Sequence, residues 1–269
     1  MTAPKTDEYW IATDRGRLFA KRWQPASAPA DGLPPIVLQH DSLGSVALWR
    51  DFPERLAVRT RHTVFAYDRL GFGQSDPYPG AIASGFIGLE PRAGLWPLCQ
   101  QLGIERFVAM GHSVGGCMSV ATAAQYPDAC VGLITESAQA FIEERTLEGI
   151  RAASVLFAQP GQLERLQKYH GEKAAWVLGA WVETWLSPNH RQWNLDDELR
   201  QVRCPVLALH GDHDEFGSTL HPHRIAERVS GPAEMEIFPA CGHVPHREAA
   251  EAVLARIADW LGRATTRAA

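Results

Sequence analysis

The chain has 269 residues, of which 45% are hydrophobic and 21% charged, and its formal net charge at pH 7 is −5. A chain of this length and composition buries enough apolar surface for one large core. Its lysines and arginines are dispersed, and no apolar run approaches the length of a membrane span. The sequence therefore argues against nucleic acid or a membrane as a partner and favours a small-molecule substrate.

The N-terminal segment and the cysteines indicate a cellular compartment. Residues 1–35 contain no apolar core of the kind that a secretory signal requires. The five cysteines are odd in number and form no C-x-x-C pair, which is typical of reduced thiols rather than of disulfide bonds or a zinc site. We therefore expect a cytoplasmic protein, present as a monomer or a homodimer.

The first half of the chain predicts alternating strands and helices. Residues 9–13 and 18–23 flank a turn at Gly16 and predict a β-hairpin, and the proline-rich residues 25–35 predict a loop. The further strands are expected at 36–39, 63–67, 107–110 and 131–135, and the helices at 46–58, 95–102 and 114–126. These strands are apolar without alternation, which predicts a parallel sheet covered by helices on both faces.

The pattern changes between residues 137 and 203, where runs typical of strands disappear. Within this segment, residues 172–186 predict a helix with an aromatic stripe. The α/β pattern then resumes, with strands at 205–209 and 235–238 and helices at 223–229 and 249–261. We therefore expect one α/β domain, formed by residues 1–136 and 204–269, with a helical insertion at 137–203.

A nucleophile motif stands between a predicted strand and a predicted helix. Gly111-His112-Ser113-Val114-Gly115 fits the pattern G-x-S-x-G, in the context that this pattern requires. The serine would sit on a tight, strained turn, whose glycines leave the space that a Cβ would fill. The N-terminus of the following helix directs its amides to a point where negative charge can develop. We interpret Ser113 as a nucleophile rather than as part of an ordinary glycine-rich turn.

A serine nucleophile needs a base, and the base needs an acid that orients it. Asp212 and Asp214 follow the strand predicted at 205–209. His243 and His246 follow the strand predicted at 235–238. The order serine, aspartate, histidine along the chain is the one expected for a nucleophile at a strand end.

Five segments resemble, in this order, the α/β-hydrolase fold family over essentially the whole chain: LQHDSLGSVALW, AYDRLGFGQSD, MGHSVGG, LHGDHDEF and CGHVPHRE. The resemblance implies a mostly parallel sheet of roughly eight strands with flanking helices, and makes the insertion a cap over the serine. It favours Asp214 over Asp212 as the acid and His243 over His246 as the base, because these positions match the family motifs.

The resemblance also implies an oxyanion hole made of two backbone N–H groups, those of Ser42 and Val114. The loop before Ser42 departs from the family, because Asp41 stands where glycine is usual. Asp41 either brings a carboxylate to the mouth of the pocket or caps a turn, and His40 is more readily a loop anchor than a catalyst. As candidate substrate-pocket residues we take His40, Trp181 and Trp185.

Two other motifs are incomplete. GFGQSD begins like a dinucleotide-binding loop but continues with Pro77, so no helix opens there to hold phosphates. LHGDHD is similar to a metal-binding run of metallo-β-lactamase-type hydrolases, but Ala208 replaces its first histidine. We expect neither a cofactor nor a metal.

The resemblance predicts a carboxylesterase-like serine hydrolase that cleaves a small to medium ester through an acyl-enzyme, with Ser113, His243 and Asp214 as its catalytic triad. A dehalogenase or epoxide hydrolase would carry aspartate in place of Ser113. A non-catalytic receptor for a small molecule remains an alternative.

A lyase of the same fold is a further alternative. The segment HDSLGSVALW is similar to the equivalent loop of 2-succinyl-6-hydroxy-2,4-cyclohexadiene-1-carboxylate synthase. Such an enzyme needs cations for the carboxylates of its substrate, and the insertion offers Arg145, Arg151, Arg165 and Arg191. Arginines that face Ser113 would favour this alternative, whereas an apolar pocket would favour the esterase.

Overall fold

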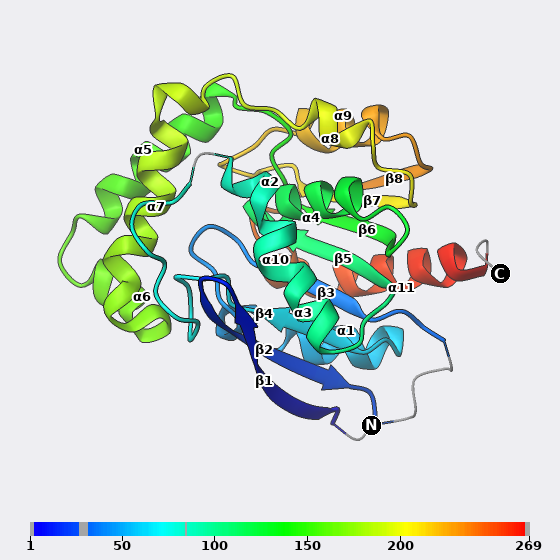
Figure 1. Ribbon diagram of the computed structural model, residues 1–269. Coiled ribbons are helices and arrows are strands. Elements are labelled where there is room, and N and C mark those ends of the chain that lie inside the picture. Colours follow the sequence, from blue (N-terminus) through cyan, green and yellow to red (C-terminus); the bar gives the residue numbers. More distant parts are fainter. Residues whose placement is uncertain (1–2, 27–31, 84, 267–269) are drawn as a thin grey trace.

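The computed structural model describes residues 3–26, 32–83 and 85–266. Its centre is a sheet of eight strands in the order β1-β2-β4-β3-β5-β6-β7-β8 (Figure 1). The strands are β1 (Lys5–Thr13), β2 (Gly16–Gln24), β3 (Ile36–Gln39), β4 (Val64–Tyr67), β5 (Phe107–His112), β6 (Cys130–Glu136), β7 (Val206–Gly211) and β8 (Ala233–Phe238). Only the pairs β1–β2 and β2–β4 are antiparallel, so the predicted mostly parallel sheet is confirmed. The loop predicted at 25–35 includes residues 27–31, which lie outside the described residues.

Helices cover both faces of the sheet, which is why its strands show no hydrophobic alternation. On β5, Phe107 and Ala109 belong to the same buried cluster as α4 (Val114–Gln125), whereas Val108 and Met110 belong to the cluster on the opposite face. That opposite face is covered by α1 (Phe52–Thr60) and α11 (Ala250–Thr266). Each face thus buries its own set of β5 side chains, as expected for a parallel sheet between two helical layers.

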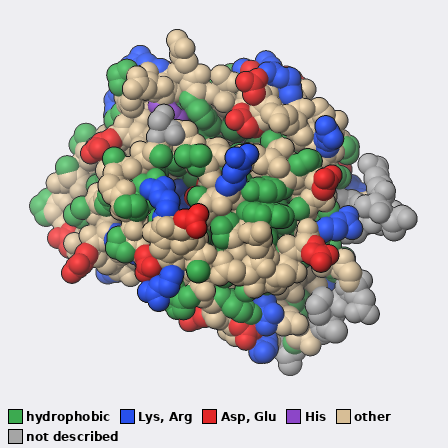
Figure 2. Space-filling view, in the orientation of Figure 1, with side chains coloured by type: hydrophobic (Ala, Val, Ile, Leu, Met, Phe, Trp, Pro, Cys, Tyr) green, Lys and Arg blue, Asp and Glu red, His purple; other side chains and the backbone are tan. Residues whose placement is uncertain are grey.

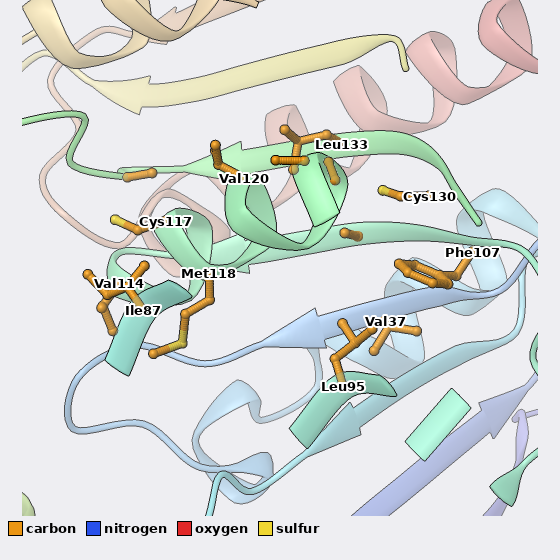
Figure 3. Packing of buried hydrophobic residues seen from close by; sticks show 14 of the residues in the cluster. Val37, Ile87, Leu95, Phe107, Val114, Cys117, Met118, Val120, Cys130 and Leu133 are labelled. Atoms are coloured by element: carbon orange, nitrogen blue, oxygen red, sulfur yellow. The ribbon is translucent and has the colours of Figure 1, made fainter. Parts of the chain in front are cut away.

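The helix α4 is buried along almost its whole length. In Figure 3, its residues Val114 and Met118 lie near Ile87 of α2 (Phe86–Glu90). Small residues dominate α4, which lets the helix approach the sheet closely and brings its N-terminus to the end of β5.

Two predicted helices differ from those in the structure. The helix predicted at 46–58 is a 3-10 helix, η1 (Val46–Trp49), followed by α1, because Arg50 adopts a φ of 54° between them. Pro53 lacks an N–H and fits only the first turn of α1. The helix predicted at 95–102 is the end of a longer helical run: α2, the π-helix η2 (Pro91–Leu95) and α3 (Trp96–Gln101).

The segment between β6 and β7 is helical, as predicted. It contains α5 (Glu144–Phe157), α6 (Gln162–His170), η3 (Gly171–Lys173), α7 (Ala174–Leu186), η4 (Pro188–His190) and α8 (Asp196–Leu199). Figure 1 shows α5, α6 and α7 together beyond the carboxyl ends of the parallel strands. In contrast, α8 contacts α4 and α9 (Leu220–Arg228) on one face of the sheet. The helices that extend over the strand ends are therefore α5 to α7.

Two buried histidines attach this segment to the rest of the molecule. His170, at the end of α6, accepts a hydrogen bond from the N–H of Gly73 at 2.9 Å and donates to the carbonyl of Leu43 at 2.9 Å. His221, in α9, accepts from the N–H of Ala140 at 3.1 Å and faces the Glu143 carboxylate at 3.1 Å. Both rings use both nitrogens, so each holds two segments that are distant in the sequence.

The surface carries charges of both signs. Figure 2 shows lysine, arginine, aspartate and glutamate side chains spread over one face of the molecule without a large patch of one sign. Within the described residues, no helix combines the length and apolar character needed to cross a membrane.

Glu143 should make the stability of the fold depend on pH. Its carboxylate accepts hydrogen bonds from Ser218 and His221. Burial raises the pKa of Glu143, but these contacts outweigh burial and lower the pKa to about 2. A carboxyl with a depressed pKa contributes stability above its unfolded pKa and loses it as the pH falls through the folded pKa. We expect Glu143→Gln to lower the free energy of unfolding by about 1 kcal/mol at pH 7, since the group is partly exposed. Urea unfolding at pH 7, 5 and 3 measures this, and a difference that does not shrink between pH 5 and pH 3 contradicts it.

Candidate active site

Ser113 occupies the turn between β5 and α4 with a strained backbone. Its φ of 55° and ψ of −125° lie in a region that residues with a side chain rarely adopt. The Ser113 N–H donates to the carbonyl of Glu136 at the end of β6, at 2.8 Å. The neighbouring parallel strand thus holds the turn in place, and Ser113 as a whole is 7% exposed.

The two glycines of the motif are required by space rather than by torsion. Neither Gly111 nor Gly115 has a positive φ. A Cβ on Gly111 would lie 2.0 Å from the carbonyl oxygen of Gly115, and a Cβ on Gly115 would lie 2.0 Å from that of Gln39. Both obstacles are backbone atoms, which cannot move aside as a side chain would. The turn therefore has room for Ser113 only because its neighbours lack side chains.

His243 lies in the loop after β8, and a buried carboxylate orients its ring. Its Nδ1 is 2.8 Å and 2.9 Å from the two carboxylate oxygens of Asp214. Asp214 also accepts hydrogen bonds from the N–H groups of Phe216 at 2.7 Å and Gly217 at 3.2 Å. Burial opposes ionisation of Asp214, but the interaction with His243 and these hydrogen bonds outweigh it and lower the pKa of the carboxyl. With Nδ1 donating to Asp214, Nε2 is the ring nitrogen left for other contacts.

Ser113 and His243 line one cavity of about 460 Å³. Its wall is mostly apolar and comes largely from α5, α6 and α7, including Ile150, Leu156, Phe157, Leu166, Trp181 and Trp185. Trp181 and Trp185, the two tryptophans taken as candidate pocket residues, therefore both line the cavity that contains Ser113. Phe216, which the sequence reasoning missed, also lines the cavity, and its ring centroid is 4.8 Å from that of His243.

His40 was also taken as a pocket residue, but it is not among the residues that line this cavity. Its Nε2 accepts a hydrogen bond from the N–H of Arg69 at 3.1 Å, and its Nδ1 donates to the carbonyl of Asp41 at 2.8 Å. Burial, together with the Arg69 charge, lowers the pKa of His40. A buried neutral ring that uses both nitrogens in this way is a loop anchor, the other role considered for it.

Backbone donors lie beside Ser113. Ser42 lines the main cavity, and Ser42 and Val114 both line a small adjoining cavity with Trp181 and Trp185. Within the described ranges, the N–H groups of Ser42 and Val114 donate to no other group. Two amides without internal acceptors at the start of α4 and in the loop after β3 are suited to an oxyanion.

The alternative acid and base make other contacts. The side chain of Asp212 lies near His213 and the N–H of Cys241, and its carboxylate makes no contact with His243. His246 is buried, and its Nδ1 is 2.6 Å from Oε2 of Glu136. The geometry thus brings Asp214, and not Asp212, to His243.

A buried cluster of His112, Glu136 and His246 was missed by the sequence reasoning. One possible ligand atom from each lies within 4.8 Å of the others, so by residue type the cluster could hold a metal ion. However, His246 is already hydrogen-bonded to Glu136, and Nε2 of His112 donates to the carbonyl of His243 at 2.7 Å. We therefore interpret the three residues as a cluster of buried polar side chains, in which His246 is hydrogen-bonded to Glu136 and His112 to the His243 carbonyl. The only sequence signal for it is Glu136, an acidic residue at the end of an apolar strand.

Of the arginines considered as partners for substrate carboxylates, one lines the cavity and others bond to protein groups elsewhere. Arg165 lines the cavity, and so does Arg247 of α10 (Pro245–Glu248), which was not anticipated. Arg145 donates to the backbone carbonyl of Asp214 at 3.2 Å, and Arg151 pairs with Glu144 at 2.7 Å. The cavity is therefore mostly apolar, with two arginines among the residues that line it.

Comparison with known proteins agrees with this architecture. A family model described as the alpha/beta hydrolase fold matches residues 34–172, just over half of the chain. A 2-hydroxy-6-oxononadienedioate/2-hydroxy-6-oxononatrienedioate hydrolase of Comamonas testosteroni is 21% identical over 252 residues, which cover 84% of this chain and 87% of that protein. A serine hydrolase of Mus musculus is 24% identical over 213 residues, covering 76% and 70% respectively. The solved structure of an esterase from Thermogutta terrifontis superposes with a TM-score of 0.74 at 22% identity, with 96% of this chain and 99% of that chain covered.

The lack of space at the serine turn predicts that alanine destabilises the protein at Gly115 but not at Gly88. Gly115→Ala should lower the free energy of unfolding by about 2–4 kcal/mol, because its Cβ would collide with the Gln39 carbonyl. Gly88→Ala in α2 is the matched control, since its Cβ would meet nothing within 4 Å and alanine favours a helix. Urea unfolding of the two variants measures the difference. Equal stabilities would mean that the turn tolerates a side chain.

Proposed function

We propose a specific reaction for this chain, which belongs to the α/β-hydrolase fold family and is a hydrolase: cleavage of a carboxylic ester by Ser113, His243 and Asp214. The observation that carries the proposal is that the strained turn presents Ser113 to the same cavity as a histidine that a buried carboxylate orients. A nucleophile, a base and an orienting acid are the parts that acyl transfer requires.

In the proposed mechanism, Nε2 of His243 takes the proton of the Ser113 hydroxyl as its oxygen attacks the ester carbonyl. The N–H groups of Ser42 and Val114 stabilise the oxyanion of the tetrahedral intermediate. His243 then gives the proton to the departing alcohol, and a water molecule hydrolyses the acyl-enzyme by the same steps. Asp214 keeps the imidazole in the required tautomer and stabilises its charged form.

The cavity supports an ester of small to medium size with an apolar part. Its volume of about 460 Å³ suits a small organic molecule, and its wall is mostly aliphatic and aromatic. The proposed route needs no cofactor, because each proton has an assigned donor and acceptor.

The triad can be tested with p-nitrophenyl butyrate and a fluorophosphonate probe. We expect Ser113→Ala to abolish labelling and to lower kcat by about three to six orders of magnitude. Asp214→Asn should lower kcat by about 10⁴-fold because the wrong tautomer is favoured, whereas the matched control Asp212→Asn should keep wild-type kcat. Wild-type protein that is neither labelled nor active would support a non-catalytic receptor instead.

Cleavage of a C–C bond in a substrate that bears a carboxylate is a second candidate function. Arg165 and Arg247 on the cavity wall favour it, since guanidinium groups bind carboxylates in a fixed geometry. The Comamonas testosteroni relative is named as the hydrolase of a dienedioate. The same triad could serve this reaction, as it could serve a lyase of this fold.

The variant Arg165→Gln distinguishes ester hydrolysis from cleavage of a C–C bond in a carboxylate-bearing substrate. If the substrate bears a carboxylate, Arg165→Gln should raise KM for a carboxylate-bearing diketone by about 10-fold or more and leave KM for neutral esters unchanged. Arg151→Gln is the matched control, because Arg151 lies on the same insertion but pairs with Glu144 away from the cavity. Steady-state kinetics on both substrate types measure the effect. Activity on neutral esters only, and no effect of Arg165→Gln, would leave the esterase as the function.

A further inference from the structure

A buried histidine and a partly exposed aspartate face each other on the wall of the cavity that Ser113 and His243 line. His112, the residue before the nucleophile, has a side chain only 3% exposed, and its Nδ1 is 3.4 Å from Oδ2 of Asp41. Its other ring nitrogen, Nε2, donates to the backbone carbonyl of His243 at 2.7 Å. The ring thus lies between the loop that precedes α1 and the loop that carries the proposed base.

The Asp41 carboxylate is itself fixed. Oδ1 accepts a hydrogen bond from the N–H of Leu43 at 2.8 Å, which caps the turn that contains Ser42. The backbone carbonyl of Asp41 accepts from Nη2 of Arg69 at 2.8 Å. Both roles considered for Asp41 are therefore combined, because it caps its own turn and its second oxygen faces His112 beside the cavity.

Charges on both sides favour a protonated His112. A carbonyl can only accept, so Nε2 of His112 must carry a proton, and protonation of Nδ1 as well would direct an N–H at Asp41. Burial opposes a charge on this ring, but the facing Asp41 carboxylate, the Glu136 charge and the His243 carbonyl outweigh burial and raise the pKa of His112. His246, on the far side, is hydrogen-bonded to Glu136, and burial lowers the pKa of its ring.

We propose that Asp41 and His112 form a positioning pair that fixes the backbone of His243 relative to the amide of Ser42. The pair joins three parts of the proposed site: the oxyanion loop through Asp41, the serine turn through His112, and the base through its carbonyl. This inference rests on the proposed function for its catalytic effect. It also gives a role to the aspartate at a position where the family resemblance expects glycine, because the Asp41 carboxylate is the group that faces Nδ1 of His112 at 3.4 Å.

Three variants test the pair. Asp41→Asn keeps an acceptor for the Leu43 N–H but removes the charge. His112→Phe removes the donor to the His243 carbonyl, whereas His112→Gln offers an amide N–H to the same oxygen. We expect Asp41→Asn and His112→Phe to lower kcat for p-nitrophenyl butyrate, and the rate of fluorophosphonate labelling of Ser113, by about 10- to 100-fold with little change in KM. His112→Gln should recover part of this loss.

Non-additivity is the sharpest sign of a pair that acts as a unit. The double variant Asp41→Asn/His112→Phe should be no slower than His112→Phe alone, because asparagine keeps the turn cap and the charge that it removes acts through the ring. Additive losses, or single variants with wild-type kcat, would overturn the proposal. Thermal unfolding of each variant identifies a loss that comes from misfolding, and if His112→Phe does not fold, the combination of Asp41→Asn with His112→Gln replaces it.

A spectroscopic measurement separates this inference from the proposed function. The proton on Nδ1 of His243, bonded to Asp214, should give a downfield NMR resonance. If Asp41 positions His243, this resonance shifts or broadens in Asp41→Asn. Wild-type protein that is not labelled at Ser113 would contradict the proposed function, and the resonance would still decide the positioning role. An unchanged resonance in Asp41→Asn overturns the pair.

Discussion

The close approach of backbone to backbone where β5 meets α4 is the constraint on which the rest of the site depends. At this point the start of α4 passes so near the end of β3 that a single Cβ would collide with a carbonyl oxygen. The strained φ of Ser113 and the N-terminus of α4 lie at this same turn. The parallel strands on either side then bring the ends of β3, β7 and β8 to the same edge, which places Ser42, Asp214 and His243 around one serine.

Much of this arrangement could be predicted from the sequence, because it depends on short, local patterns. Apolar runs of four or five residues predicted the two-sided sheet, and G-x-S-x-G between a strand and a helix predicted the serine turn. The choice of Asp214 over Asp212 came from the family resemblance, and the contact of Asp214 with His243 agrees with it. The break of the helix at Arg50 was missed, since Pro53 was not weighed against the apolar spacing.

What the sequence could not supply are contacts between segments far apart in the chain. His112 and His243 are 131 residues apart, and Glu136 and His246 are 110 residues apart. No local periodicity indicates such pairs, and nothing in the sequence around His40 shows that its ring accepts a hydrogen bond from Arg69, 29 residues along the chain. A buried ionisable side chain needs a partner, so each charged residue in an apolar strand or tight loop predicts that a partner exists without identifying it.

The two histidine anchors make the insertion less modular than its place in the sequence indicates. His170 occupies the Leu43 carbonyl and the Gly73 N–H of the main domain, and His221 of the main domain serves Ala140 and Glu143. A chimera that exchanged only residues 137–203 with a relative would leave these buried groups unpaired on one side of each junction. Transplanting substrate preference between members of this fold therefore requires moving the anchors together with the cap, as one graft of segments that are discontinuous in the chain.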